Sequence, residues 1–150
     1  MHTLRAVESA DDLRAMHDIR LATLFTPERH PGIVYDQNHP LDLDPANTRF
    51  LLWWDNRAIG VVRLDRRGSG EGVVRLVAIV PEVQRGGHGR ALMGLVEDEA
   101  RRRGMRKLML NAHKSASGFY ERLGWSNEVW DDAERTSMAD HSVQMSKVLG

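Results

Sequence analysis

Apolar residues recur along the chain with two periods, and each period predicts a type of secondary structure. Leu4 to Val7 has the composition of a short strand. Ser9 follows, with acidic residues two and three positions later, as is typical of a helix N-cap and first turn. Beyond it, apolar residues at intervals of three or four positions predict a helix that runs to about Thr23 and packs one face against a sheet.

Three apolar, β-rich runs in the middle of the chain predict three consecutive strands. They are Phe50 to Trp54, Ala58 to Asp65 and Val73 to Val80. Residues 55–57 have the composition of a hairpin loop, and the glycine-rich residues 66–72 turn the chain a second time. Strands joined by such short turns are antiparallel, so these three form a meander.

The remaining elements alternate between helix and strand. A helical pattern follows Gly89 and ends near Gly104. The strand after it should lie parallel to Val73–Val80, because a helix separates the two. In order, we expect a strand at Lys107–Ala112, a helix at Ser115–Leu123, and an antiparallel pair at Trp125–Trp130 and Ser142–Leu149, joined by the polar, acidic residues 131–140. The result is an α+β fold in which helices cover both faces of one sheet.

Phe25 to Thr48 breaks every periodicity and is predicted to be irregular, with room for one helical turn. It contains four prolines together with several Asp and Asn residues. An irregular segment of this length is uncommon in a compact domain and is usually functional or disordered. Its polar residues are therefore candidates for a site: Tyr35, His39, Asp42 and Asp44.

The segment from Gln84 to Gly89 has the pattern of a phosphate-binding loop. Three glycines among four residues follow a buried strand and precede a helix, so the backbone N–H groups at the helix start are uncovered. Those donors and the positive end of the helix dipole favour a phosphate or pyrophosphate, and Arg85 and Arg90 flank them. The segment is neither a Walker loop, which needs Gly-Lys-Ser/Thr, nor a G-x-G-x-x-G fingerprint. A loop that merely turns a corner is the alternative.

The composition limits the kinds of protein that this chain can be. With 150 residues, 41% hydrophobic and 28% charged, it has the size and composition of one globular domain over residues 1–150. Twenty-one basic residues balance twenty-one acidic ones, so no global field favours nucleic acid or a membrane as a partner. The absence of cysteine excludes thiolate metal sites and cysteine nucleophiles, and the histidines have no metal-ligand spacing. Since no stretch resembles a signal peptide or a membrane span, we expect a cytoplasmic protein.

A second motif, from Leu110 to Trp125, identifies the family that the chain resembles. Its sequence is Leu-Asn-Ala-His-Lys-Ser-Ala-Ser-Gly-Phe-Tyr-Glu-Arg-Leu-Gly-Trp. Together with Gln84-x-x-Gly87-x-Gly89, it closely resembles the GNAT superfamily of acyl-CoA-dependent N-acyltransferases, whose order of elements matches nearly the whole chain. The resemblance implies a GNAT-like mixed, mostly antiparallel twisted sheet, with helices on both faces and a splayed central pair of parallel strands.

The resemblance also implies a site for acetyl-CoA as co-substrate, without a metal. Loop amides cradle the pyrophosphate, the end of the central strand pairs with the pantetheine amides, and a nearby N–H polarises the thioester carbonyl. The residues implied in cofactor binding are Ala78, Ile79, Val80, Gln84, Arg85, Gly86, Gly87, His88, Gly89, Arg90 and Tyr120. Tyr120 corresponds to the tyrosine that protonates the departing thiolate, which a phenol with a pKa of about 10 can do. A core aromatic residue is the alternative for Tyr120.

Two positions depart from the family pattern. His113 stands where the family often has an asparagine, and it is a second candidate catalytic residue, with a helix-flanking histidine as the alternative. The strand at residues 73–80 lacks the glutamate that many members use as a general base, and Arg75 is its only ionisable residue. The remaining candidates for the base are water and five side chains: His39, Glu71, Glu82, His113 and His141.

We therefore expect an N-acetyltransferase that transfers an acetyl group from acetyl-CoA to an amine by direct attack in a ternary complex. A catalytically weak acyl-CoA-binding or sensor domain is the alternative. The acceptor is a small amine or a peptide amine, and proteins with folds of this kind are often homodimers. Two loops that flank the acceptor side carry carboxylates, which would favour a cationic amine unless they are merely solvated. These are Asp36, Asp42 and Asp44 on one loop and Asp131, Asp132 and Glu134 on the other.

Overall fold

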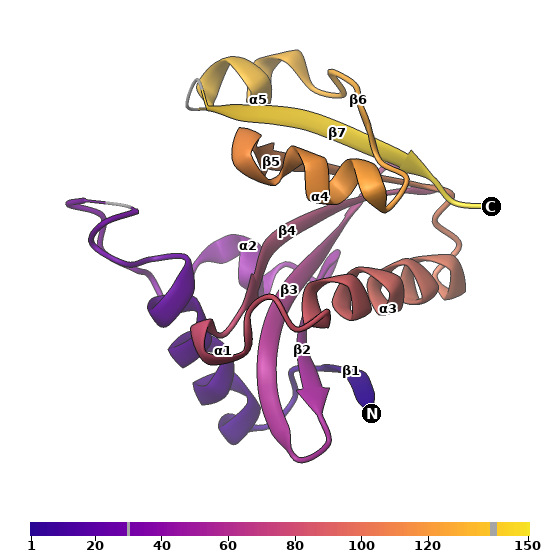
Figure 1. Ribbon diagram of the computed structural model, residues 1–150. Coiled ribbons are helices and arrows are strands. Elements are labelled where there is room, and N and C mark those ends of the chain that lie inside the picture. The colour runs from indigo at the N-terminus through magenta and orange to yellow at the C-terminus, as the bar shows by residue number, and fades with distance from the viewer. Residues whose placement is uncertain (30, 139–140) are drawn as a thin grey trace.

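The computed structural model describes residues 1–29, 31–138 and 141–150, which form one sheet with helices around it (Figure 1). Within these residues the sheet has seven strands in the order β1-β2-β3-β4-β5-β7-β6. They are β1 (His2–Ala6), β2 (Asn47–Trp54), β3 (Arg57–Arg67), β4 (Glu71–Ile79), β5 (Lys107–His113), β6 (Ser126–Asn127) and β7 (Ser142–Val148). Neighbouring strands are antiparallel except for β4 and β5. The predicted mixed, mostly antiparallel sheet is confirmed.

The helices begin and end largely where local signals predict. They are α1 (Ala10–Thr23), α2 (Pro40–Leu43), α3 (His88–Arg102), α4 (Ser117–Arg122) and α5 (Asp132–Ser137), with 3₁₀ turns at η1 (Pro81–Val83) and η2 (Lys114–Ala116). The Ser9 hydroxyl accepts the N–H of Asp12 at 3.0 Å, and the Asp12 carboxylate accepts the N–H of Ser9, which makes a capping box. α2 is the helical turn expected in the irregular segment. Left-handed Gly104, with φ of 79°, follows α3 as predicted.

One expectation for the C-terminal part was wrong. The strand expected at Trp125–Trp130 is limited to β6, because the chain then turns inward and Trp130 Nε1 donates to the Leu110 carbonyl at 3.1 Å. The polar, acidic linker contains a helix that was not predicted, because Asp131 begins α5 by accepting the N–H of Glu134 at 3.0 Å. Residues 139 and 140 of the same linker lie outside the described residues.

Helices cover both faces of the sheet. Val61 and Val62 are adjacent in β3 and therefore point to opposite faces, yet each is only 1% exposed. α1 packs against β3 and β4, and α3 packs against β1, β3 and β4. The buried core accordingly includes Met16 from α1 and Leu92 and Val96 from α3. Among the described residues, no helix is long and apolar enough to cross a membrane.

β4 and β5 separate soon after they begin to pair (Figure 1). Their parallel register joins Glu71–Val73 to Lys107–Met109 and then stops. On the other side of β4, Val62 of β3 lies opposite two residues, Leu76 and Val77, which form a β-bulge. Leu76 has a φ of 54°, in the left-handed region that leucine rarely adopts. The expected splayed parallel pair is therefore confirmed, and the bulge marks where β4 changes direction.

Gly72 gives a test of how tightly the β4–β5 junction is packed. A Cβ at Gly72 would lie 2.5 Å from Met105 Sδ and 3.1 Å from Leu108 Cδ2. Gly72→Ala should therefore lower the free energy of unfolding by about 1–3 kcal/mol through overpacking. Gly94, inside α3, has no atom within 4 Å of such a Cβ, so Gly94→Ala is the matched control. It should raise the free energy of unfolding by about 0.5–1 kcal/mol. Urea unfolding measures both, and a stabilised Gly72→Ala protein would contradict the packing described.

Candidate active site

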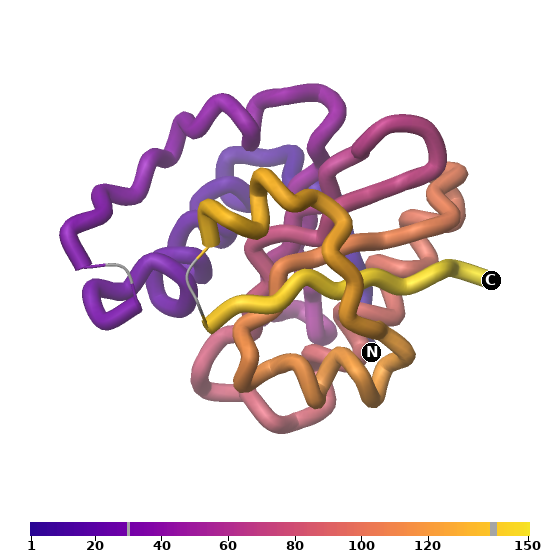
Figure 2. The backbone as a smooth tube through the Cα atoms, turned by 90° about the horizontal axis from the view of Figure 1, so that it is seen from above, coloured from indigo at the N-terminus to yellow at the C-terminus, as the bar shows by residue number. Residues whose placement is uncertain are grey.

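The protein contains a cavity of about 880 Å³ on the side where β4 and β5 separate. One wall is the irregular segment between α1 and α2, which follows a long arc outside α1 (Figure 2). The opposite wall is the end of β5 and the start of α4, and the bulged part of β4 lies between them. The lining residues are Arg20, Leu24, Phe25, Arg29, Ile33, Val34, Tyr35, Asp36, His39, Leu41, Asp42, Arg63, Val74, Arg75, Leu76, Val77, Leu110, Asn111, Ala112, His113, Ala116, Tyr120 and Glu134.

The end of β4 presents backbone groups to the opening. The N–H of Val80 donates to the carbonyl of Ile59 in β3 at 2.8 Å. Since the backbone groups of successive residues alternate between the two edges of a strand, Ala78 and Val80 face β3 and Ile79 faces the opening. The Ile79 carbonyl accepts the side-chain amide of Gln84 at 2.9 Å, and a carbonyl oxygen has a second lone pair. Of the three strand residues expected to bind the cofactor arm, Ile79 therefore offers a donor and an acceptor.

The glycine-rich loop leaves the start of α3 open. Arg85 and Gly87 are left-handed, with φ of 67° and 82°, and Gly87 is the N-cap of α3. Among the described residues no side chain caps this end, so the first N–H groups of a 15-residue helix have no side-chain partner there. A Cβ at Gly89 would lie 3.4 Å from Phe119 Cζ, so α4 borders the loop. Arg85 and Arg90 are exposed beside it. This backbone has the donors and the dipole that bind phosphate groups.

The side chain of His88 lies away from this loop. Its Nδ1 is 2.8 Å from Nε2 of His2, and its ring is tilted against Trp54 with centroids 4.6 Å apart. The ring also lies behind the loop, because a Cβ at Gly86 would be 3.1 Å from its Nε2. Only the backbone N–H of His88 can therefore contribute to an anion site, whereas its ring holds the loop against the N-terminal strands.

Tyr120 lines the cavity from α4. Its ring packs edge-on against Phe119 and Trp125, with centroids 5.1 and 6.0 Å away. Among the described residues, no hydrogen bond to its hydroxyl is formed. Burial raises the pKa of the phenol, so the hydroxyl stays protonated at neutral pH. Tyr120 can therefore act as a proton donor inside the cavity.

Two histidines of the cavity are held as hydrogen-bond donors. Nδ1 of His113 accepts the N–H of Ser115 at 3.2 Å, and Nδ1 of His39 accepts the N–H of Leu41 at 3.2 Å. A neutral ring whose Nδ1 accepts a bond carries its proton on Nε2. Each ring thus offers an N–H, and it would have to give up its backbone contact before Nδ1 could take a proton from an amine.

The other expected bases do not line the cavity. His141 packs against the ring of His113, with centroids 4.5 Å apart. Glu71 begins β4, at the end where β4 and β5 still pair. Glu82 forms an ion pair with Arg57 at the surface. Neither glutamate is positioned to replace the missing strand glutamate.

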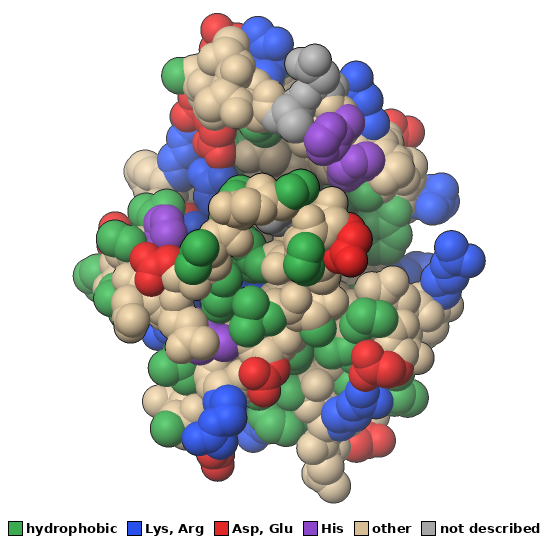
Figure 3. Space-filling model, turned by 90° about the vertical axis from the view of Figure 1, so that its left-hand side faces the viewer, with side chains coloured by type: hydrophobic (Ala, Val, Ile, Leu, Met, Phe, Trp, Pro, Cys, Tyr) green, Lys and Arg blue, Asp and Glu red, His purple; other side chains and the backbone are tan. Residues whose placement is uncertain are grey.

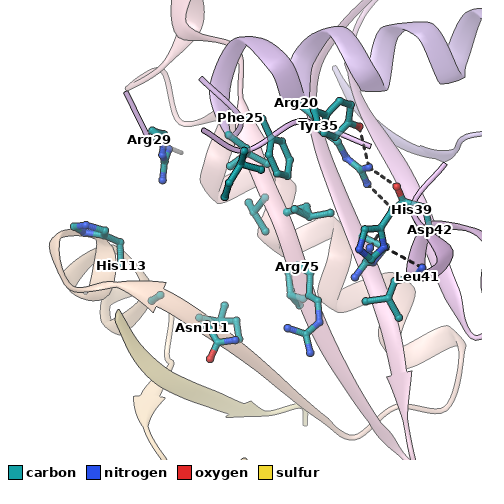
Figure 4. Close-up of a pocket in the computed structure, with 18 of the residues that line it drawn as sticks. Arg20, Phe25, Arg29, Tyr35, His39, Leu41, Asp42, Arg75, Asn111 and His113 are labelled. Atoms are coloured by element: carbon teal, nitrogen blue, oxygen red, sulfur yellow. Dashed lines mark hydrogen bonds and ion pairs between the residues drawn. The ribbon is translucent and has the colours of Figure 1, made fainter. Parts of the chain in front are cut away.

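Six charged side chains form a continuous chain beside the cavity, part of which is seen in Figure 4. They alternate in sign in the order Arg20, Asp42, Arg63, Asp65, Arg75 and Glu134. Successive N–O distances are 2.8, 3.0, 2.7, 3.2 and 2.5 Å. The members come from α1, α2, β3, β4 and α5. The ion chain therefore connects both walls of the cavity to the sheet between them.

The ion chain changes the expected role of the acidic residues. Burial opposes the charge of Asp42, but hydrogen bonds from Arg20 and Arg63 hold its pKa below the ordinary value. Burial likewise opposes the charge of Glu134, and Arg75 outweighs it, so that this pKa is also lowered. These two carboxylates are therefore paired with arginines and not free to bind a cationic substrate. The other four are placed as follows: Asp36 lines the cavity, Asp44 and Asp131 accept backbone N–H groups, and Asp132 pairs with Arg135.

Arg75 is recognisable in the sequence as the only ionisable residue at positions 73–80, but its partner is not. Glu134 lies 59 residues further along the chain, where Arg75 Nη1 donates to it. No local pattern links two such positions. The N-cap signal at Asp131 was the one feature that could have revealed the helix that carries Glu134.

The comparisons with known proteins agree with this architecture. The model of the acetyltransferase (GNAT) family matches residues 13–125. An acyl-CoA N-acyltransferase from Pseudomonas aeruginosa aligns over 99% of both chains, with 20% identity and a TM-score of 0.77. The ribosomal-protein-S18-alanine N-acetyltransferase from Escherichia coli aligns over 100% of this chain and 95% of its own, with 20% identity and a TM-score of 0.74. N-acetylglutamate synthase from Neisseria gonorrhoeae, complexed with coenzyme A and N-acetyl-glutamate, aligns over 100% of this chain and 35% of its own, with 22% identity and a TM-score of 0.72. At these identities the structural likenesses show a shared fold.

Asp42→Asn should destabilise the protein because the buried guanidinium of Arg20 loses its counter-ion and that of Arg63 keeps only Asp65. The side chain of Asp42 is only 2% exposed between Arg20 and Arg63. We expect the free energy of unfolding at neutral pH to fall by about 3–5 kcal/mol. Asp44→Asn, in the exposed part of the same segment, should change it by less than about 0.5 kcal/mol. Urea unfolding of both variants makes the comparison.

The pH dependence of stability gives a second measure of the same contact. The pKa of Asp42 is depressed in the folded state, so the unfolded state takes up the proton first as the pH falls. Its stabilising contribution should be present above the unfolded pKa of about 4 and be lost as the pH falls through the lower, folded pKa. We expect the free energy of unfolding to fall more steeply with decreasing pH across this range for the wild-type protein than for Asp42→Asn. Parallel pH profiles would contradict the ion pairing.

Proposed function

Because the chain belongs to the acetyltransferase (GNAT) family, we propose that it is an N-acetyltransferase that moves an acetyl group from acetyl-CoA to an amine. The observation that carries this proposal is the cavity between β4 and β5, which is lined by Tyr120. The uncapped start of α3 follows the end of β4, and α4, which carries Tyr120, follows the end of β5. If they bind phosphate and donate a proton, respectively, the two elements would suit a thioester substrate that also contains a pyrophosphate.

The residues of the glycine-rich loop fit the pyrophosphate of acetyl-CoA. The left-handed N-cap at Gly87 leaves the N–H groups of residues 88–90 without a side-chain cap. Arg85 and Arg90 would add charge-assisted contacts, and His88 would contribute its backbone alone. Along β4, the N–H and C=O of Ile79 would pair with an amide of the pantetheine arm. Gln84 holds that carbonyl in place.

The chemistry needs a proton donor and a route for the proton of the amine. When bound, acetyl-CoA supplies the thioester carbon that the amine attacks. Tyr120 would then donate its phenolic proton to the sulfur as the C–S bond breaks, since the raised pKa keeps the phenol protonated at neutral pH, and the phenolate would regain a proton from water. Since His39 and His113 are held as N–H donors, the proton of the amine passes to water. The chain has no cysteine to form an acetyl-enzyme, so the amine attacks directly in a ternary complex.

Tyr120→Phe removes the proton donor and keeps the ring. We expect kcat to fall by about 10²-fold while the affinity for acetyl-CoA is unchanged. Thiol release at saturating substrate and calorimetric titration of acetyl-CoA measure the two quantities. Glu121→Gln, an exposed neighbour on the same helix, should leave both unchanged. Weaker acetyl-CoA binding with a normal kcat would instead make Tyr120 a packing residue.

Gly87→Ala tests the phosphate loop. A Cβ at a φ of 82° is strained, by about 1–2 kcal/mol, so the loop should shift and the Kd for acetyl-CoA should rise about tenfold. S-acetylpantetheine lacks the pyrophosphate, so its use as acetyl donor should be the same in the variant and the wild-type protein. Gly94→Ala in the middle of α3 is the control. Equal losses with both acetyl donors would contradict the role of the loop.

Thiol release from acetyl-CoA in the presence of a panel of amines tests the function itself. The panel contains polyamines, aminoglycosides, amino acids, and peptides with a free N-terminus or lysine. Turnover with one class would support acetyl transfer and identify the acceptor. Binding of acetyl-CoA without thiol release across the panel would favour an acyl-CoA-binding or sensor domain instead.

A further inference from the structure

We propose, building on the acetyl transfer inferred above, that the acceptor is an amine that carries a carboxylate and an apolar side chain. A free apolar α-amino acid has this chemistry. In the proposed complex Arg29 binds its carboxylate, and the apolar part of the cavity takes its side chain. Three features of the cavity lead to this acceptor: two of its three carboxylates are already paired with arginines, one arginine is left over, and its other lining residues are largely apolar.

The carboxylates of the cavity have little to offer a second positive charge. Asp42 is 2% exposed, and both of its oxygens accept bonds from arginines. Glu134 accepts from Arg75 through both oxygens and from Asn111 through one. Asp36 is the remaining acidic lining residue, and one of its oxygens accepts the N–H of Asn38 at 2.8 Å. A polyamine or an aminoglycoside would bring several charges to this single carboxylate, so the cavity disfavours polycations.

Arg29 is the cation that the ion chain does not include. Four arginines and three carboxylates line the cavity. All of these arginines except Arg29 belong to the ion chain. Among the described residues Arg29 has no ion pair, and its guanidinium makes one long hydrogen bond, of 3.4 Å, to the carbonyl of Thr23. In Figure 4, Arg29 lies at the same end of the cavity as His113 and apart from the ion chain. A guanidinium with open donors is suited to bind a carboxylate through two hydrogen bonds.

Apolar side chains make up much of the remaining lining. On the irregular segment Ile33 and Val34 are 60% and 90% exposed, and Phe25 lies in contact with Tyr35 at a ring distance of 4.7 Å. On the sheet side the bulge contributes Leu76 and Val77. Figure 3 shows this face of the molecule, with hydrophobic side chains across its middle. An apolar side chain on the acceptor would remove these groups from water.

The size of the cavity agrees with a small acceptor. At about 880 Å³ it falls within the range of about 300–1,000 Å³ that is typical of small-molecule sites. It must hold the acetylated end of the cofactor arm together with the acceptor. That leaves room for an amino acid and little for a long peptide.

Matched pairs of acceptors separate the contribution of the carboxylate from that of the side chain. L-Phenylalanine is compared with phenethylamine, and L-leucine with isoamylamine, so that each pair differs only in the carboxylate. For the wild-type protein, kcat/KM for thiol release should be about tenfold or more higher for each amino acid than for its amine. Spermidine and an aminoglycoside should be poorer acceptors than either amino acid.

Arg29→Gln should lower kcat/KM for the amino acid of each pair to the level of its amine and leave the amine unchanged. Arg14→Gln is the matched control, because Arg14 is an exposed arginine that does not line the cavity. Val34→Ser should raise KM for phenylalanine and leucine more than for alanine. Its control is Val129→Ser, which changes another exposed valine outside the cavity. These side chains are exposed, so the variants should fold normally.

Calorimetric binding of L-phenylalanine to the coenzyme A-saturated protein keeps the test independent of turnover. Arg29-dependent binding without thiol release from any amine would uphold the acceptor site and reject acetyl transfer. A preference for polycations, for peptides or for amines without a carboxylate would overturn the acceptor inference while acetyl transfer stands. An equal effect of Arg29→Gln on both members of a pair would overturn it too.

Discussion

The three-residue parallel contact between β4 and β5 is the constraint on which the rest of the site depends. The two strands pair over Glu71–Val73 and then part, because the bulge at Leu76 and Val77 turns β4 away. The glycine-rich loop continues from the end of β4, and α4 continues from the end of β5. The angle between the strands therefore sets how far the open N–H groups at the start of α3 lie from Tyr120. Fully paired strands would close the space that both elements face.

The alternating ion chain stabilises that open geometry. A gap in a sheet exposes a strand edge, and the walls beside it need support from other elements. Arg63 and Arg75 project from neighbouring positions on β3 and β4, and Asp42 and Glu134 reach them from α2 and α5. The ion chain holds α2 of the irregular segment and α5 of the C-terminal linker against the sheet. It also leaves few unpaired charges along the cavity. In the acceptor site proposed here, selection would rest on the apolar lining and on Arg29, which lies outside the ion chain.

Proton chemistry in the cavity is asymmetric. Tyr120 is half-buried and protonated, which suits an acid. Nδ1 of His39 caps α2, and Nδ1 of His113 caps η2. Each cap occupies the ring nitrogen that could have acted as a base. Whether a histidine here is a helix cap or a base therefore depends on one hydrogen bond from a backbone N–H to its Nδ1. An amine acceptor whose proton leaves through water agrees with this arrangement.

Much of the fold follows from the sequence itself, because its signals act over a few residues. Ser9 caps α1, residues 55 and 56 turn the hairpin, Gly87 and Gly104 bound α3, and the order of strands and helices follows from periodicity. The spacing of the two motifs was sufficient to identify the family. Only the tertiary structure decided that Leu76 adopts a left-handed bulge, that the strand after Trp125 stops at β6, and that Asp42 and Glu134 pair with arginines. Those outcomes depend on side chains from distant parts of the chain. The energy of burying a charge is set by whichever opposite charge the fold brings to it, and no local pattern carries that information.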